Sequence, residues 1–96
     1  MSKNINIPED ARARYLERRK VDLEILRADV RGLTFEAFKR IGHQLKGNAA
    51  SYGYPELEVV GIHMEDAGDR QDQKSASTCL ENFAAWVTAH TAASST

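Results

Sequence analysis

His43, Lys46 and Gly47 are the residues of this sequence best suited to chemistry, and a helical pattern of apolar residues surrounds them. At about 100° per residue, His43 lies roughly 130° away from the apolar face of that helix, so its imidazole is expected to be exposed. An exposed imidazole is a candidate nucleophile through one ring nitrogen. The apolar face itself consists of residues that step by three and four: Phe35, Phe38, Gly42, Leu45, Ala49 and Tyr52.

Lys46 and Gly47 follow His43 by about one helical turn, and both suit the transfer of an anionic group. Lys46 offers a charge-assisted hydrogen bond to phosphoryl oxygens. A glycine on an exposed helix face costs about 1 kcal/mol relative to alanine, and no core packing requires one at Gly47. We therefore interpret Gly47 as space for the reactive group of another protein. Lys39 and Arg40, one turn before His43, are expected to contribute to partner binding.

The composition describes one small domain of 96 residues with a formal net charge of -1. A chain of this length has little material for a deep enzyme cleft, and the absence of a basic excess argues against a nucleic-acid partner. A single cysteine, Cys79, excludes an intrachain disulfide and a cysteine-based zinc site. No apolar run approaches the ~18 residues of a membrane span, and the first ten residues lack the apolar region of a secretory signal. We expect a cytoplasmic, monomeric, stand-alone protein that contacts no membrane.

The small net charge conceals two oppositely charged halves. Residues 1–50 hold 11 basic and 7 acidic side chains, and residues 51–96 hold 2 basic and 7 acidic side chains. The halves therefore carry +4 and -5. This asymmetry has two interpretations: attraction between packed helices, or a basic surface around His43.

Apolar periodicity predicts four helices and no strand, which favours an all-α, antiparallel up-and-down four-helix bundle over residues 8–90 with flexible ends at 1–7 and 91–96. The expected helices span 8–31, 34–52, about 55–68 and about 75–90, with a polar linker at 69–75. Thr34 is expected to be an N-cap, Gly53 a C-cap, and Gly32 and Gly68 helix stops. The expected buried positions outside the His43 helix are Leu16, Leu23, Leu26, Val30, Leu33, Leu57, Val60, Met64, Ala67, Cys79 or Leu80, Phe83, Trp86 or Val87, and His90.

Residues 43–57, HQLKGNAASYGYPEL, resemble the signature of histidine-containing phosphotransfer (Hpt) domains. That signature is a histidine, one residue, leucine, lysine, glycine, small residues, and a glycine ten positions after the histidine. The corresponding positions here are His43, Leu45, Lys46, Gly47, Ala49, Ala50 and Gly53. The resemblance extends over about residues 10–90. The chain is similar both to stand-alone Hpt proteins and to the phosphotransfer domain of chemotaxis histidine kinases.

The resemblance implies a role for each matching residue. His43 would accept and donate a phosphoryl group through Nε2, Lys46 would stabilise its oxygens, and Gly47 would leave room for the partner. The family places a Gln or Glu 22 positions after the histidine to hydrogen-bond the other ring nitrogen, and Glu65 occupies that position. Ile62, one turn before Glu65 and facing away from the core, is expected to belong to a docking patch.

The resemblance also implies what this chain is not. It would carry a phosphoryl group between a histidine kinase and the aspartates of response-regulator receiver domains, without being an enzyme. The sequence contains no GxxxxGK[ST] motif or other nucleotide-binding loop. No cofactor and no metal site are expected, because the metal ion needed for transfer would belong to the receiver partner.

Two other functions remain open from the sequence. A helical protein-interaction module would use the same surface without phosphorylation. A metal-binding bundle would use His43, His63 and Glu65, although it would lack the Glu-x-x-His pairs of di-metal bundles and Lys46 would repel a cation.

Overall fold

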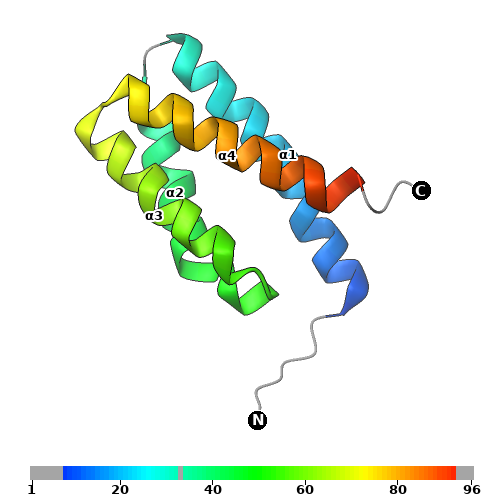
Figure 1. Ribbon diagram of the computed structural model, residues 1–96. Coiled ribbons are helices and arrows are strands. Elements are labelled where there is room, and N and C mark those ends of the chain that lie inside the picture. Colours follow the sequence, from blue (N-terminus) through cyan, green and yellow to red (C-terminus); the bar gives the residue numbers. More distant parts are fainter. Residues whose placement is uncertain (1–7, 33, 93–96) are drawn as a thin grey trace.

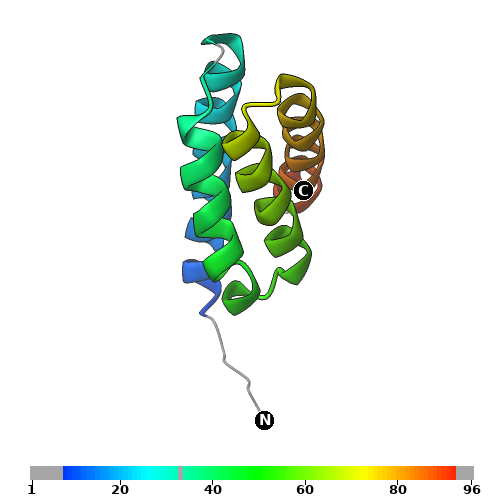
Figure 2. The same cartoon turned by 90° about the vertical axis from the view of Figure 1, so that its left-hand side faces the viewer.

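The computed structural model describes residues 8–32 and 34–92, and all of its regular structure is helical. The helices are α1 (Glu9–Gly32), α2 (Glu36–Asn48), the 3-10 helix η1 (Ala50–Tyr52), α3 (Pro55–Arg70) and α4 (Gln73–Ala92). The colours in Figure 2 run up α1, down α2, up α3 and down α4, so successive helices alternate in direction. Each long helix packs against the next, and α4 also packs beside α1 (Figure 1). The predicted all-α four-helix bundle is confirmed.

The core is formed by the apolar faces that the periodicity predicts, with the additions Tyr15, Ala37, Ile41 and Ala76. Its largest fully buried apolar side chains are Phe38, Phe83, Leu26, Ile41, Leu45, Leu57 and Met64. Ile41 was not among the expected positions. Several expected positions are only partly buried, and Leu33 lies outside the described residues. The partly buried ones are Leu16, Val30, Phe35, Tyr52, Val60 and His90. The charged residues Arg19 and Asp22 are also buried, and Arg19 Nε donates to Asp22 Oδ2 at 2.8 Å. The pairing explains how α1 places two charges among apolar neighbours.

The residue that caps the start of α2 differs from the prediction. The N-cap position is Phe35, which makes no side-chain capping bond, so the expected N-cap at Thr34 is wrong. Thr34 instead donates its hydroxyl to Asp29 Oδ1 at 2.7 Å. The other oxygen of Asp29 accepts the backbone N–H of Ala37 at 2.7 Å. A carboxylate of α1 therefore caps α2, which satisfies one of the free N–H groups at its start.

The connections on the two sides of α3 both differ from the prediction, the first being longer and the second shorter. The expected helix over 34–52 is divided, because α2 ends at Asn48 with Ala49 as its C-cap and η1 follows. Gly53, with φ of +92°, is therefore a C-cap, as predicted, but of η1 and not of α2. Gly68 does not end α3, which continues to Arg70 and has Gln71 as a left-handed C-cap. The expected linker at 69–75 is therefore reduced to the turn at 71–72. Asp72 stabilises the start of α4, because its carboxylate accepts the backbone N–H of Ser75 in the first turn of that helix.

Aromatic side chains fasten the α2–α3 connection to the outer helices. Tyr15 of α1 stacks on Tyr52 with ring centroids 4.2 Å apart. Tyr54 and Trp86 of α4 form a T-shaped pair with ring centroids 5.1 Å apart. Tyr15 also donates its hydroxyl to Asn48 at the end of α2. These contacts hold the end of α2 that follows His43.

The described chain reaches Ala92, slightly past the expected boundary, while residues 1–7 and 93–96 lie outside the described residues. Within the described residues, no helix is long and apolar enough to cross a membrane.

Candidate functional site

The contact between α2 and α3 is unusually close because glycines line it. A Cβ atom built on Gly42 would lie 2.5 Å from the backbone nitrogen of Glu65, and one built on Gly61 would lie 2.8 Å from the carbonyl oxygen of Gly42. A Cβ on Gly68 would meet the backbone nitrogen of Lys39 at 2.9 Å. Gly42 and Gly61 therefore permit the close packing of α2 against α3, and Gly68 has a packing reason to lie inside α3.

This close approach brings Glu65 of α3 to His43 of α2. Nδ1 of His43 and Oε2 of Glu65 are 3.1 Å apart, which is hydrogen-bonding distance. The His43 side chain is 70% exposed, as the helical pattern predicts, while that of Glu65 is 24% exposed. The protein therefore contacts the imidazole at Nδ1, and most of the His43 side chain is open to solvent.

Glu65 also binds Lys46, through its second oxygen. Lys46 Nζ lies 2.7 Å from Oε1 of Glu65, so a single carboxylate joins the lysine and the histidine. The hydrogen bond from Lys46 is the main cause that holds the pKa of Glu65 below its ordinary value of 4.5. Burial of the carboxyl acts in the opposite direction, and the hydrogen bond from His43 lowers the pKa further. Glu65 is consequently ionised at neutral pH.

The ionised carboxylate determines which ring nitrogen of His43 holds the proton. A carboxylate only accepts hydrogen bonds, so in the neutral ring Nδ1 must be the donor. Nε2 then carries a lone pair, on the side of the ring away from Glu65. The arrangement is that of a nucleophile with a fixed tautomer.

The helix surface one turn after His43 is open at Gly47. Gly47 follows His43 by one turn, and a Cβ atom built on it would meet nothing within 4 Å among the described residues. Its place on the exposed face agrees with the prediction from the sequence. The space beside the imidazole is open because the glycine has no side chain, and the core does not need that space.

The remaining residues predicted to bind a partner lie on α2 and α3. Lys39 lies one turn before His43 and pairs with Asp69 at 3.9 Å, while Arg40 is exposed. Ile62 is 44% exposed on α3, as expected. The sequence reasoning missed Val59, which is 51% exposed one turn before Ile62. Its spacing of three from Ile62 was the signal that could have indicated a patch rather than a single apolar residue.

The charge asymmetry of the sequence becomes contact across α2 and α3. The pairs Lys46–Glu65 and Lys39–Asp69 each join the basic half to the acidic half. These pairs fit the first interpretation, attraction between packed helices, and they lie in the same region as the basic residues around His43.

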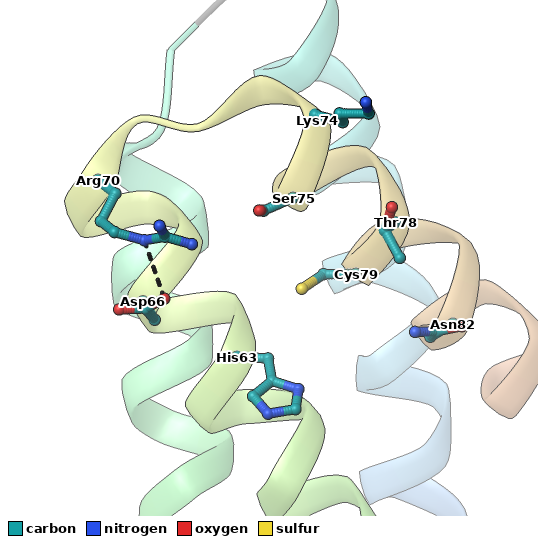
Figure 3. A pocket seen from close by; sticks show the side chains of 8 residues that line it. All are labelled: His63, Asp66, Arg70, Lys74, Ser75, Thr78, Cys79 and Asn82. Carbon is teal, nitrogen blue, oxygen red and sulfur yellow. Dashed lines mark hydrogen bonds and ion pairs between the residues drawn. The ribbon is translucent and has the colours of Figure 1, made fainter.

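Of the three residues of the metal-binding alternative, His43 and Glu65 are in contact, but His63 does not complete a metal site with them. His63 lies two residues from Glu65 on α3 and lines a cavity of about 440 Å³ between α3 and α4, together with Cys79. Figure 3 shows its ring on the side of α3 that faces α4. No group of three or more His, Cys, Asp or Glu side chains in the described part of the chain is arranged to hold a metal ion.

The two other histidines are explained by packing and exposure. His63 is exposed beside that cavity, and His90 stacks on Trp86 at 4.0 Å and bonds through Nδ1 to the Trp86 carbonyl oxygen. His90, which was expected at a buried position, is only partly buried.

Comparison with known proteins gives one match. A family model described as the Hpt domain matches residues 10–95. No curated protein and no solved structure matches the chain significantly.

Proposed function

The chain belongs to the Hpt domain family, and we propose that His43 is the residue through which it carries a phosphoryl group. Hpt domains act in the phosphotransfer of two-component signalling and are phosphocarriers rather than enzymes. The observation that supports His43 is its exposed imidazole, held at Nδ1 by Glu65 with Nε2 open. His63 and His90 have no comparable carboxylate at Nδ1 among the described contacts.

The proposed step is an attack by Nε2 of His43 on the phosphorus of an aspartyl phosphate in a receiver domain. The N–P bond forms as the bond from phosphorus to the aspartyl oxygen breaks, and that oxygen leaves as a carboxylate. The lone pair of Nε2 supplies the new bond, and the Nδ1 proton remains on the ring. The ring thereby becomes positively charged, and the Glu65 carboxylate 3.1 Å from Nδ1 stabilises that charge. The reverse sequence returns the group to a receiver.

Lys46 and Gly47 have different parts in this step. The Lys46 ammonium lies within reach of both the Glu65 carboxylate and the space around His43, so it stabilises the phosphoryl oxygens. Gly47 leaves the approach to Nε2 open. The chain itself does not assemble a complete catalytic centre, and the receiver partner is expected to contribute the metal ion.

The partners are proposed to be receiver domains and a histidine kinase. Ile62 and Val59 offer adjacent apolar side chains on α3 for docking, and Lys39 and Arg40 add positive charge on α2. The small apolar area suits transient contact by a monomer better than a permanent interface. A cytoplasmic location follows from the partners, since phosphotransfer to receiver domains takes place there.

The test uses the full chain and a receiver domain carrying radiolabelled phosphate. Label is expected to pass to the parent protein as an acid-labile, alkali-stable adduct, which is the behaviour of phosphohistidine. His43→Ala should accept no label, whereas the matched variant His63→Ala, which removes another exposed imidazole, should accept it normally. Equal labelling of parent and His43→Ala would show that the site assignment is wrong.

The same variants address the alternative of a protein-interaction module without phosphotransfer. His43→Gln keeps a polar side chain on the exposed face of α2 and should still fold and bind receivers, while signalling through the protein is lost. Full signalling by His43→Gln would favour the interaction module.

A further inference from the structure

We propose that Gly61 is a positioning residue for His43, because it sets the separation of α2 and α3 at which Glu65 reaches the imidazole. This inference rests on the proposed function of His43 and adds a residue that touches none of the reacting atoms. Gly61 lies in α3 one turn before Glu65 and is buried on the side covered by α2.

The contact at Gly61 is between backbones. A Cβ atom at this position would lie 2.8 Å from the carbonyl oxygen of Gly42 and 2.8 Å from the backbone nitrogen of Lys46. Both atoms belong to the helical backbone of α2, so neither can rotate away as a side chain would. Ordinary contact with a Cβ begins near 3.4 Å, so the two helices would have to separate by about 0.6 Å.

The opposite side of the same contact involves Glu65 directly. A Cβ on Gly42 would lie 2.5 Å from the backbone nitrogen of Glu65 and 3.0 Å from its Cα. The backbone of Glu65 therefore rests on Gly42, the residue immediately before His43. Any separation of α2 and α3 at Gly61 is passed to the pair formed by His43 and Glu65.

That pair tolerates little separation. The distance from His43 Nδ1 to Glu65 Oε2 is 3.1 Å, and an added 0.6 Å would give about 3.7 Å, which is no longer a hydrogen bond. Rotation of the Glu65 side chain to recover this bond would loosen the one from Lys46 at 2.7 Å, because both use the same carboxylate. The expected result is a weaker preference for the tautomer with the proton on Nδ1.

The test compares Gly61→Ala with two matched variants in the full chain. Gly32→Ala adds the same methyl group at a helix position with nothing within 4 Å, and Val87→Ala removes buried atoms of α4 without inserting any between α2 and α3. Nitrogen-15 NMR of the His43 ring, at a pH where the imidazole is neutral, reports the tautomer. Transfer from a phosphorylated receiver reports the rate.

Gly61→Ala is expected to move the His43 ring toward the tautomer with the proton on Nε2 and to lower the transfer rate about tenfold or more, as loss of a group orienting a histidine does. Gly32→Ala and Val87→Ala should keep the parent tautomer, even where Val87→Ala is the less stable protein. A folded Gly61→Ala protein with the parent tautomer would overturn the proposal.

These measurements distinguish a change in the position of His43 from a loss of folding and from a failure of the proposed function. If Gly61→Ala is unfolded in buffer, the NMR measurement is made in trimethylamine N-oxide, which favours the compact state. The tautomer is measured without any phosphoryl group. A parent protein that shows the Nδ1–H tautomer but accepts no label would therefore refute the function of His43 and leave the role of Gly61 intact.

Discussion

Replacement of Glu65 by alanine removes the partner of both His43 Nδ1 and Lys46 Nζ in one change. The phosphorylated ring is positively charged, and a carboxylate 3.1 Å away stabilises it by about 1.3 kcal/mol in water and about 5 kcal/mol at an effective dielectric constant of 20. Because His43 is 70% exposed, the lower figure is the better guide. It corresponds to about a tenfold slower transfer.

Loss of the fixed tautomer adds to this effect, so the total decrease is expected to lie between about tenfold and a hundredfold. Glu65→Gln should fall between the parent and Glu65→Ala, because its amide oxygen still accepts from Nδ1 but carries no charge. The assay is quenched-flow transfer of label from a phosphorylated receiver domain, with the rate constant read at saturating receiver.

The control is Asp66→Ala. Asp66 is the next residue of α3, and its replacement removes the same unit of charge. Its carboxylate pairs with Arg70 on the exposed surface and not with His43. An exposed pair of this kind contributes only about 0.3–0.5 kcal/mol to stability. Parent-like transfer by Glu65→Ala, or an equal decrease in Asp66→Ala, would refute the reasoning.

Three further predictions concern access, pH and docking. Gly47→Gln should raise the free energy of unfolding by up to about 0.5–1 kcal/mol, since nothing surrounds this helical glycine, and denaturant titration measures this change. The same variant should slow phosphoryl transfer, because the added side chain blocks the partner. Parent-like transfer would contradict the access argument. The lowered pKa of Glu65 means that its stabilising contribution is complete above about pH 4.5 and is lost as the pH falls through the lower folded-state pKa, so the difference in unfolding free energy between the parent and Glu65→Gln should shrink in that acidic range. A difference that stays constant down to full protonation would argue against the Glu65 contacts. Ile62→Lys and Val59→Lys should weaken receiver binding in calorimetry, whereas Val21→Lys, at an exposed apolar residue of α1, should not; equal weakening by all three would remove the patch.

The helical period explains why the sequence predicted so much of α2. A residue's direction around a helix depends only on its position along the chain, so the exposure of His43, the openness at Gly47 and the burial of Phe38 and Leu45 follow from spacing alone. The number of helices and the all-α class follow for the same reason.

The errors at helix ends have a common physical cause. The cap of α2 comes from Asp29, which lies only eight residues before Ala37 but belongs to α1, so it reaches the start of α2 only because of how the two helices pack. Gly68 resembles a helix stop locally, but its small size serves contact with Lys39 of another helix. Local propensity is overruled where another element supplies the missing hydrogen bond or requires the space.

The sequence by itself determined the reactive imidazole and the chemistry available around it, because residue type and helical direction are properties of a single segment. The resemblance in residues 43–57 pointed further, to Glu65 22 positions after His43. Only the tertiary structure decided that one carboxylate binds His43 through one oxygen and Lys46 through the other. These contacts depend on the separation and rotation of two helices, which are set by backbone contact at glycines and not by the pattern of either helix alone.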